Sequence, residues 1–119
     1  MAKTLYHYPG CSTCRRARKW LDGQGIAYKM VHLAETPPSA KVLADVWNRS
    51  GLPLKKFFNT SGQSYRGGGF KDRLGTMSED EKLSSLSADG MLIKRPILDH
   101  GDGVLVGFRE EAWAQSLGV

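Results

Sequence analysis

The chain has 119 residues, which is enough for one domain with a hydrophobic core and too few for two independent ones. Apolar residues make up 40% and charged residues 24%, and no apolar stretch approaches the roughly 18 residues that a membrane span needs. The first ten residues, MAKTLYHYPG, have no apolar run suited to a signal peptide. We therefore expect a cytoplasmic protein that does not bind a membrane.

The formal net charge of +5, from 17 Lys and Arg against 12 Asp and Glu, favours anionic partners. These basic residues are spread along the chain instead of forming one long run. A nucleic-acid-binding face would combine a concentrated basic patch with aromatic or groove-reading elements, and neither is evident. The distribution of charge argues against direct nucleic-acid binding.

The N-terminal third predicts a β-α-β unit. Residues Thr4–Tyr8 are rich in strand formers and are followed by the turn pair Pro9-Gly10. A helix is predicted from Ser12 to Gly23, with an apolar face formed by Cys14, Ala17 and Leu21. Strand character returns at Tyr28–Leu33, so the two strands should be parallel.

The rest of the chain predicts a helical insert followed by a β-β-α unit. The insert holds a helix from Pro37-Pro38-Ser39 to Gly51, short helical turns at 54–58 and 64–74 with a surface loop at Gly67–Gly69, and a helix that follows the capping box Ser78–Glu81. The β-β-α unit holds a hairpin of residues 96–99 and 104–106 and a final helix near Arg109. The order indicates a sheet of about four strands covered by helices, in an α/β or α+β sandwich.

The two cysteines of the chain, Cys11 and Cys14, form a C-x-x-C motif where the first strand's loop meets the first helix. The free N–H groups and the positive end of the helix dipole favour a thiolate at Cys11, and Arg15 and Arg16 add positive charge. Cys14 lies in the first turn on the buried face. The motif therefore predicts an exposed attacking thiol and a shielded resolving thiol, close enough to form a disulfide.

Three other interpretations of the cysteine pair fit less well. Cytosolic thiols are kept reduced, which disfavours a structural disulfide. A zinc site needs two more ligands, and His7, His32 and His100 lack the spacing of a ligand pair, so we expect no metal. Two merely apolar cysteines would not need this location and spacing. Redox chemistry is the prediction.

Several segments are together similar to one known family in the same order, namely YPGCSTCRRARKWL, LKKFFNTSGQSYR, MSEDEKL, DGMLIKRPIL and VGFREEAW. On the basis of these segments, the chain resembles the arsenate-reductase-like (ArsC/Spx/YffB) family of the thioredoxin fold over essentially its whole length. The resemblance implies one thioredoxin-like domain over residues 1–119, with a four-stranded mixed sheet flanked by helices and a helical insert between the β-α-β and β-β-α parts.

The resemblance also implies roles for individual residues. Cys11 matches the family's nucleophilic cysteine, and Pro96 matches a cis proline that faces it. Arg95 and Arg109 match arginines that hold the anionic substrate. Ser12 and Thr13, in the first turn of the helix, complete the predicted anion-binding set.

These roles lead to two hypotheses of function. In the first, Cys11 attacks an oxidised or oxyanion substrate, Cys14 resolves the adduct as a disulfide, and glutathione, a glutaredoxin or a thioredoxin resets the pair without any bound cofactor. In the second, the chain is a redox-sensing regulator like Spx, which shares the C-x-x-C motif and acts through a protein partner such as RNA polymerase.

Two positions depart from the arsenate reductases of the family. Those enzymes usually lack a second cysteine at the place of Cys14, and they carry a further arginine where this chain has Asn59. The nearest arginine is Arg66, seven residues on. A neutral amide cannot neutralise an oxyanion, so we expect arsenate reduction to be feeble or absent.

Overall fold

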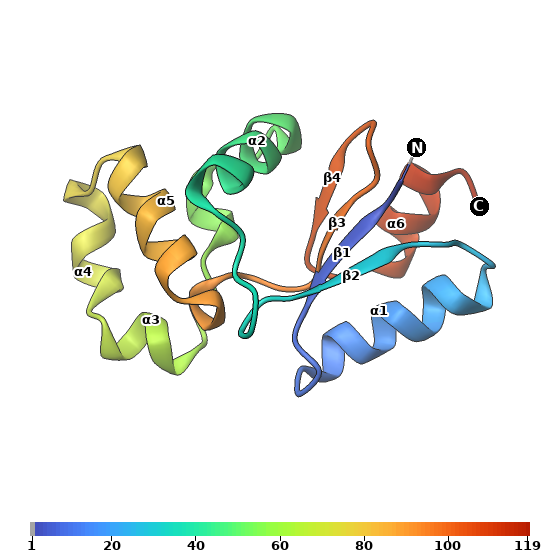
Figure 1. Cartoon of the computed structure of the whole chain (residues 1–119), viewed down its shortest axis with the longest axis horizontal. Helices are drawn as coiled ribbons and strands as arrows, with labels where there is room; N and C mark the ends of the chain where they lie inside the picture. The colour runs from blue at the N-terminus through green and yellow to red at the C-terminus, as the bar shows by residue number, and fades with distance from the viewer. Residues whose placement is uncertain (1) are drawn as a thin grey trace.

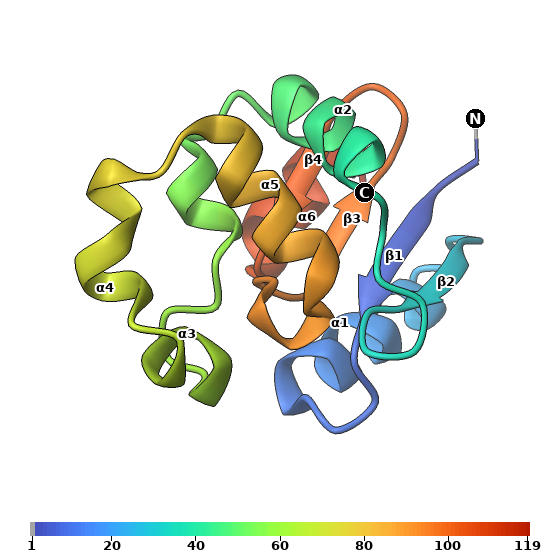
Figure 2. The ribbon, with the colours of Figure 1, turned by 60° about the vertical axis from the view of Figure 1, so that its left-hand side comes forward.

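The computed structural model describes residues 2–119, in which a four-stranded sheet is covered by helices on both faces (Figures 1 and 2). The strands are β1 (Thr4–His7), β2 (Lys29–His32), β3 (Ile97–Asp99) and β4 (Val104–Val106). The α-helices are α1 (Ser12–Gly23), α2 (Ala40–Ser50), α3 (Gln63–Gly67), α4 (Phe70–Arg73), α5 (Glu79–Ala88) and α6 (Glu110–Leu117). Within the described residues, none of these helices has both the length and the apolar character that crossing a membrane requires.

The sheet has the strand order β2-β1-β3-β4. β1 and β2 are parallel and are joined by α1, whereas β3 pairs antiparallel with both β1 and β4. This mixed sheet confirms the predicted α/β class and the division into a β-α-β and a β-β-α part. In Figure 1, α1 and α6 lie on one side of the sheet, and α2 and α5 lie on the other.

Each face of the sheet builds its own hydrophobic core, because alternate strand residues point to opposite faces. Leu5 of β1 and its partner Leu98 of β3 pack with α1 and α6. Tyr6 and its partner Ile97 face the other way and pack with the insert. The helix carrying the cysteines and the insert are thus held independently, on opposite faces of the same central strands.

The insert runs from α2 to β3 and includes three short 3₁₀-helices, η1 (Leu54–Phe57), η2 (Leu74–Thr76) and η3 (Gly90–Leu92). Its end pairs with its middle: the Asn59 amide donates to the Leu92 carbonyl at 2.8 Å, and the Lys94 amide donates to the Phe57 carbonyl at 2.7 Å. The Arg49 guanidinium of α2 donates to the Asp99 carboxylate of β3 at 2.8 Å, which fixes the insert to the sheet.

Most predicted elements are present with boundaries shifted by one or two residues. The predicted capping box exists, since the Ser78 and Glu81 side chains each accept a hydrogen bond from the other residue's backbone amide. The surface loop predicted at Gly67–Gly69 is shorter than expected. Gly67 ends α3, and only Gly68 and Gly69 form the turn to α4, with a left-handed φ of 68° at Gly69.

Gly90 lies against the chain that leaves β2. A Cβ atom at this position would overlap the carbonyl group of Leu33, and that backbone cannot move without disturbing the end of the sheet. Leu33 is itself fully buried and its amide donates to the His7 carbonyl. The close approach therefore fixes η3, and the segment that follows it, relative to the central strands.

Gly90→Ala is expected to destabilise the fold by about 2 kcal/mol or more, because the added methyl group overpacks a buried backbone contact. Gly75→Ala is the matched control, since a Cβ atom there meets nothing within 4 Å. Thermal unfolding of the two variants and the parent checks this. Equal melting temperatures for all three would contradict the close approach.

Candidate active site

Cys11 is the N-cap residue of α1. The turn Tyr8–Cys11, closed by a hydrogen bond of 3.0 Å from the Cys11 amide to the Tyr8 carbonyl, carries the chain from β1 into the helix. Cys11 has extended backbone angles, and its Sγ accepts the Cys14 amide proton at 3.4 Å. The sulfur therefore occupies the position where the unpaired N–H groups of the helix converge.

This position favours the ionised form of Cys11, which is partly exposed. Burial alone would raise the pKa of the thiol. Hydrogen bonds from Cys14 and from the Thr13 amide, together with the positive charge of Arg95, outweigh burial and hold the pKa of Cys11 below its usual value. Cys11 is thus prepared to act as a nucleophile.

Cys14 has the opposite character. Its side chain is completely buried, and burial raises the pKa of its thiol to about 12, with a further increase from the neighbouring Cys11. Both cysteines are free thiols in this structure. One helical turn therefore carries an acidified, accessible sulfur and a protonated, shielded one.

Arg95 lies at the end of the insert, directly before β3. One terminal nitrogen donates to the carbonyl oxygens of Met91 at 3.1 Å and Ile93 at 3.4 Å. Its guanidinium carbon lies 5.3 Å from the centre of the Tyr8 ring, a cation–π distance. The guanidinium is thus held between the insert and the turn that precedes Cys11.

The other residues predicted next to Cys11 differ in their placement. Pro96 is fully buried, and the Arg95–Pro96 peptide bond is cis, as the resemblance implies. Thr13 contributes its backbone amide to Cys11, while its hydroxyl accepts a hydrogen bond from Arg16 at 3.4 Å. Ser12 is exposed at the start of α1.

A recess of about 340 Å³ lies on the insert side of Arg95. Its lining consists of Asn59, Ser61, Gly62, Gln63, Ser64, Arg66, Met91 and Arg95. Arg66 and Asn59 both face this space. The family pattern marked Asn59 as the position where relatives carry an arginine, and Arg66 as the nearest arginine to it in the sequence. Tyr8 and Met91, which position Arg95, were not found by sequence reasoning, because no motif marks a side chain that acts by stacking or a carbonyl that accepts a bond.

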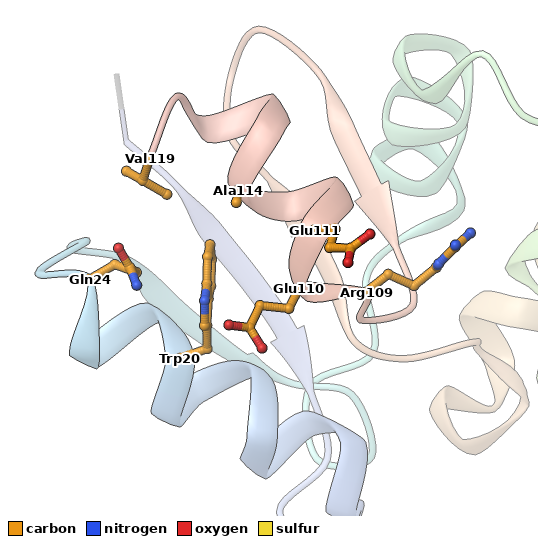
Figure 3. Close-up of a pocket in the computed structure, with 7 residues that line it drawn as sticks. All are labelled: Trp20, Gln24, Arg109, Glu110, Glu111, Ala114 and Val119. Atoms are coloured by element: carbon orange, nitrogen blue, oxygen red, sulfur yellow. The ribbon is translucent and has the colours of Figure 1, made fainter.

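Arg109 is the N-cap residue of α6. It lines a larger cavity of about 650 Å³ between α1 and α6, together with Trp20 and Gln24 from the C-terminal end of α1 (Figure 3). The Arg109 side chain points away from Trp20 in this view. The arginine whose charge lowers the pKa of Cys11 is Arg95. The structure brings together Cys11, Cys14 and Arg95, and the anion-binding role of Arg109 stays a prediction.

The three histidines considered as zinc ligands do not form a set of metal ligands. His7 and His32 are neighbours on β1 and β2, with ring centres 5.9 Å apart. His100 lies in the β3–β4 turn. Among residues 2–119, no group of three or more His, Cys, Asp or Glu side chains is arranged to hold a metal ion.

Comparison with known proteins identifies the family. The ArsC family model matches residues 6–116. This chain belongs to the ArsC family.

The Bacillus subtilis protein YusI is 50% identical over 98% of both chains. Among solved structures, an ArsC family related protein from Bacteroides fragilis is 40% identical with a TM-score of 0.92 and 97% coverage of both chains. A possible arsenate reductase from Streptococcus mutans is 46% identical with a TM-score of 0.86, covering 93% of this chain and 96% of its own.

Less similar members of the family include both enzymes and regulators. An arsenate reductase of Neisseria meningitidis is 28% identical, covering 79% of this chain and 80% of its own. The regulatory protein MgsR of Bacillus subtilis is 25% identical, covering 88% of this chain and 82% of its own. Membership of the family is thus compatible with either of the two hypotheses of function.

The rate of alkylation of Cys11 is expected to rise with pH through a midpoint below the ordinary cysteine value of about 8.5, because its folded-state pKa is lowered. Cys14 should stay unlabelled until the protein is unfolded, since its pKa is raised to about 12 and its side chain is buried. Iodoacetamide labelling from pH 5 to 9, followed by peptide mapping, measures both. Preferential labelling of Cys14 would reverse the assignment.

Two arginine variants form a matched pair for this measurement. Arg95→Gln should move the midpoint of Cys11 labelling to higher pH, because the positive charge of Arg95 stabilises the thiolate. Arg109→Gln removes the same charge from the N-cap of α6 and should leave the midpoint unchanged, because Arg95 is the arginine whose charge lowers the pKa of Cys11. An equal shift in both variants would show that only the net charge of the protein matters.

Proposed function

We propose that this chain is a cytoplasmic thiol–disulfide oxidoreductase in which Cys11 is the nucleophile and Cys14 the resolving thiol. The observation that supports this most directly is the opposite character of two sulfurs on one helical turn. A lowered pKa supplies thiolate at neutral pH, whereas a raised pKa keeps the second thiol protonated until the first has reacted.

The proposed cycle has three steps. The Cys11 thiolate attacks a sulfur of a substrate disulfide, forms a mixed disulfide and releases the first substrate thiolate. The Cys14 thiol then loses its proton and attacks Cys11 Sγ, which closes the intramolecular disulfide and releases the second thiolate. An external thiol, namely glutathione, a glutaredoxin or a thioredoxin, returns both cysteines to the reduced form.

Cys14→Ser is expected to accumulate a mixed disulfide on Cys11 when the protein is exposed to glutathione disulfide, because the resolving sulfur is absent. Intact-mass spectrometry should show one glutathione added to the variant and only a loss of two hydrogens in the parent. Cys11→Ser is the control and should form neither product. If Cys14→Ser releases its adduct as fast as the parent does, an external thiol performs the resolution.

Arsenate is proposed to be a poor substrate, although relatives carry the name arsenate reductase. Asn59 faces the recess beside Arg95, where its neutral amide can donate a hydrogen bond but supplies no charge. One missing charge-assisted hydrogen bond costs about 1.5–3 kcal/mol, or roughly 10- to 150-fold in affinity.

Asn59→Arg should therefore raise arsenate turnover with glutathione and glutaredoxin by at least about tenfold over a very low parental rate. Thr60→Arg adds the same charge at the neighbouring exposed residue and serves as the control. Fast arsenate turnover by the parent, unchanged by Asn59→Arg, would show that this part of the anion site is assigned incorrectly.

A redox-sensing regulator is the second candidate, and similarity to MgsR over 88% of this chain favours it. The same disulfide would then change the affinity for a protein partner instead of completing a catalytic cycle. The number of turnovers separates the two functions. An enzyme consumes many equivalents of disulfide per chain, whereas a sensor stops after one.

A further inference from the structure

We propose that the recess beside Arg95 binds a carboxylate group of a low-molecular-weight thiol while that thiol is disulfide-bonded to Cys11, and that Arg66 determines this specificity. The inference rests on the proposed function, because it assumes attack by Cys11 on a disulfide. It adds the class of substrate, a small thiol bearing a carboxylate, and the residues that recognise it.

The recess adjoins the reactive sulfur through Arg95. This residue contributes to the lining, stacks on Tyr8 of the turn before Cys11, and acts by its charge on the Cys11 thiolate. Both ribbon views place α3, which carries Arg66, on the same side of the molecule as the start of α1 (Figures 1 and 2). Arg95 therefore links the recess that Arg66 lines to the surroundings of the Cys11 sulfur.

The side chains around the recess are suited to an organic anion. Arg66 and Arg95 supply two guanidinium groups, and Asn59, Ser61, Gln63 and Ser64 supply neutral hydrogen-bond donors. No Asp or Glu belongs to this lining. Guanidinium groups bind carboxylates through paired hydrogen bonds, so the recess offers positive charge with the matching geometry.

Both arginines have unused donors. The Arg66 guanidinium makes no hydrogen bond or ion pair to any of residues 2–119, and Arg66 is exposed at the edge of the recess. Arg95 is restrained by its bonds to two backbone carbonyls, yet its buried Nε has no partner among the same residues. A ligand can therefore gain hydrogen bonds from Arg66 without first breaking those of the protein.

The volume favours an organic thiol over an inorganic oxyanion. At about 340 Å³, the recess falls within the range of about 300–1,000 Å³ that small-molecule sites occupy. A tetrahedral anion of five heavy atoms would fill only a small part of it. The amino-acid-sized arm of a carboxylate-bearing thiol would fill more of it.

The reaction assigned to this site balances with a symmetrical disulfide, RSSR, as the oxidant. The Cys11 thiolate forms a bond to one sulfur of RSSR, and the other leaves as a thiolate, RS⁻. The Cys14 sulfur, after losing its proton, displaces the second RS⁻ from Cys11. Two RS⁻ gain the two electrons that the protein dithiol loses, and the Cys14 proton converts one RS⁻ to RSH at neutral pH.

Rapid-quench mass spectrometry of Cys11 with two probes tests the proposal. Glutathione disulfide carries carboxylates, whereas bis(2-hydroxyethyl) disulfide carries none. Arg66→Gln should slow the reaction with glutathione disulfide about tenfold and change the reaction with bis(2-hydroxyethyl) disulfide less than about twofold. Lys71→Gln, which removes the same charge from the exposed face of neighbouring α4, is the control and should change neither rate.

The two probes separate the inference from the function on which it rests. If Cys11 of the parent reacts with neither disulfide, the proposed oxidoreductase function is wrong. If both probes react but Arg66→Gln behaves like Lys71→Gln, the function stands and the carboxylate site is overturned. Equal slowing of both probes by Arg66→Gln would also overturn it, because a carboxylate could not then be what Arg66 recognises.

Discussion

The site depends on one constraint, which is that the sulfur of Cys11 takes the place of an N-cap oxygen. An ordinary N-cap residue satisfies the first amides of a helix with a hydroxyl or carboxylate. Here the Cys14 amide donates to a sulfur instead, at 3.4 Å. The same bond that begins α1 therefore also stabilises the negative charge of the nucleophile, so that helix formation and activation of the thiol are one physical event.

The pKa of the second cysteine, Cys14, is set by its burial in the fold. Cys14 is completely buried on the inward side of α1, as are Ala17 and Leu21. The fold raises one thiol pKa and lowers the other by placing the two sulfurs on different sides of one helical turn. In the reduced protein, the environment of each sulfur thus favours a different protonation state.

The sequence predicted the elements better than it predicted the contacts between them. The parallel pairing of β1 with β2 and the β3–β4 hairpin follow from the β-α-β and β-β-α patterns, and the placement of Cys11 follows from the turn pair Pro9-Gly10 before a helical pattern. These are local signals that hydrophobic periodicity and turn chemistry carry. Fold class and the different environments of the two cysteines could therefore be predicted from residues alone.

The positions of the arginine side chains could not be predicted from such local signals. Matching to a family pattern assigned Arg95 and Arg109 to one anion site; the charge of Arg95 acts on Cys11, whereas the role of Arg109, at the N-cap of α6, stays a prediction. Arg66 was visible only as the nearest basic residue to Asn59, and it reaches the recess because α3 packs there through buried Tyr65. Which side chains meet across an insert depends on its tertiary packing, for which no short motif exists.

The placement of the thiolate against fixed positive groups has an electrostatic consequence. In the reduced protein, the Cys11 charge compensates the N-terminal end of α1 and the guanidinium of Arg95. A disulfide with Cys14 carries no charge, so oxidation uncovers a positive potential at the surface where the next reactant must arrive. Reducing agents are thiolates, and many of them are anionic elsewhere as well. In the proposed cycle, the oxidised protein would therefore attract anionic thiolates more strongly than the reduced protein does, without any movement of the backbone.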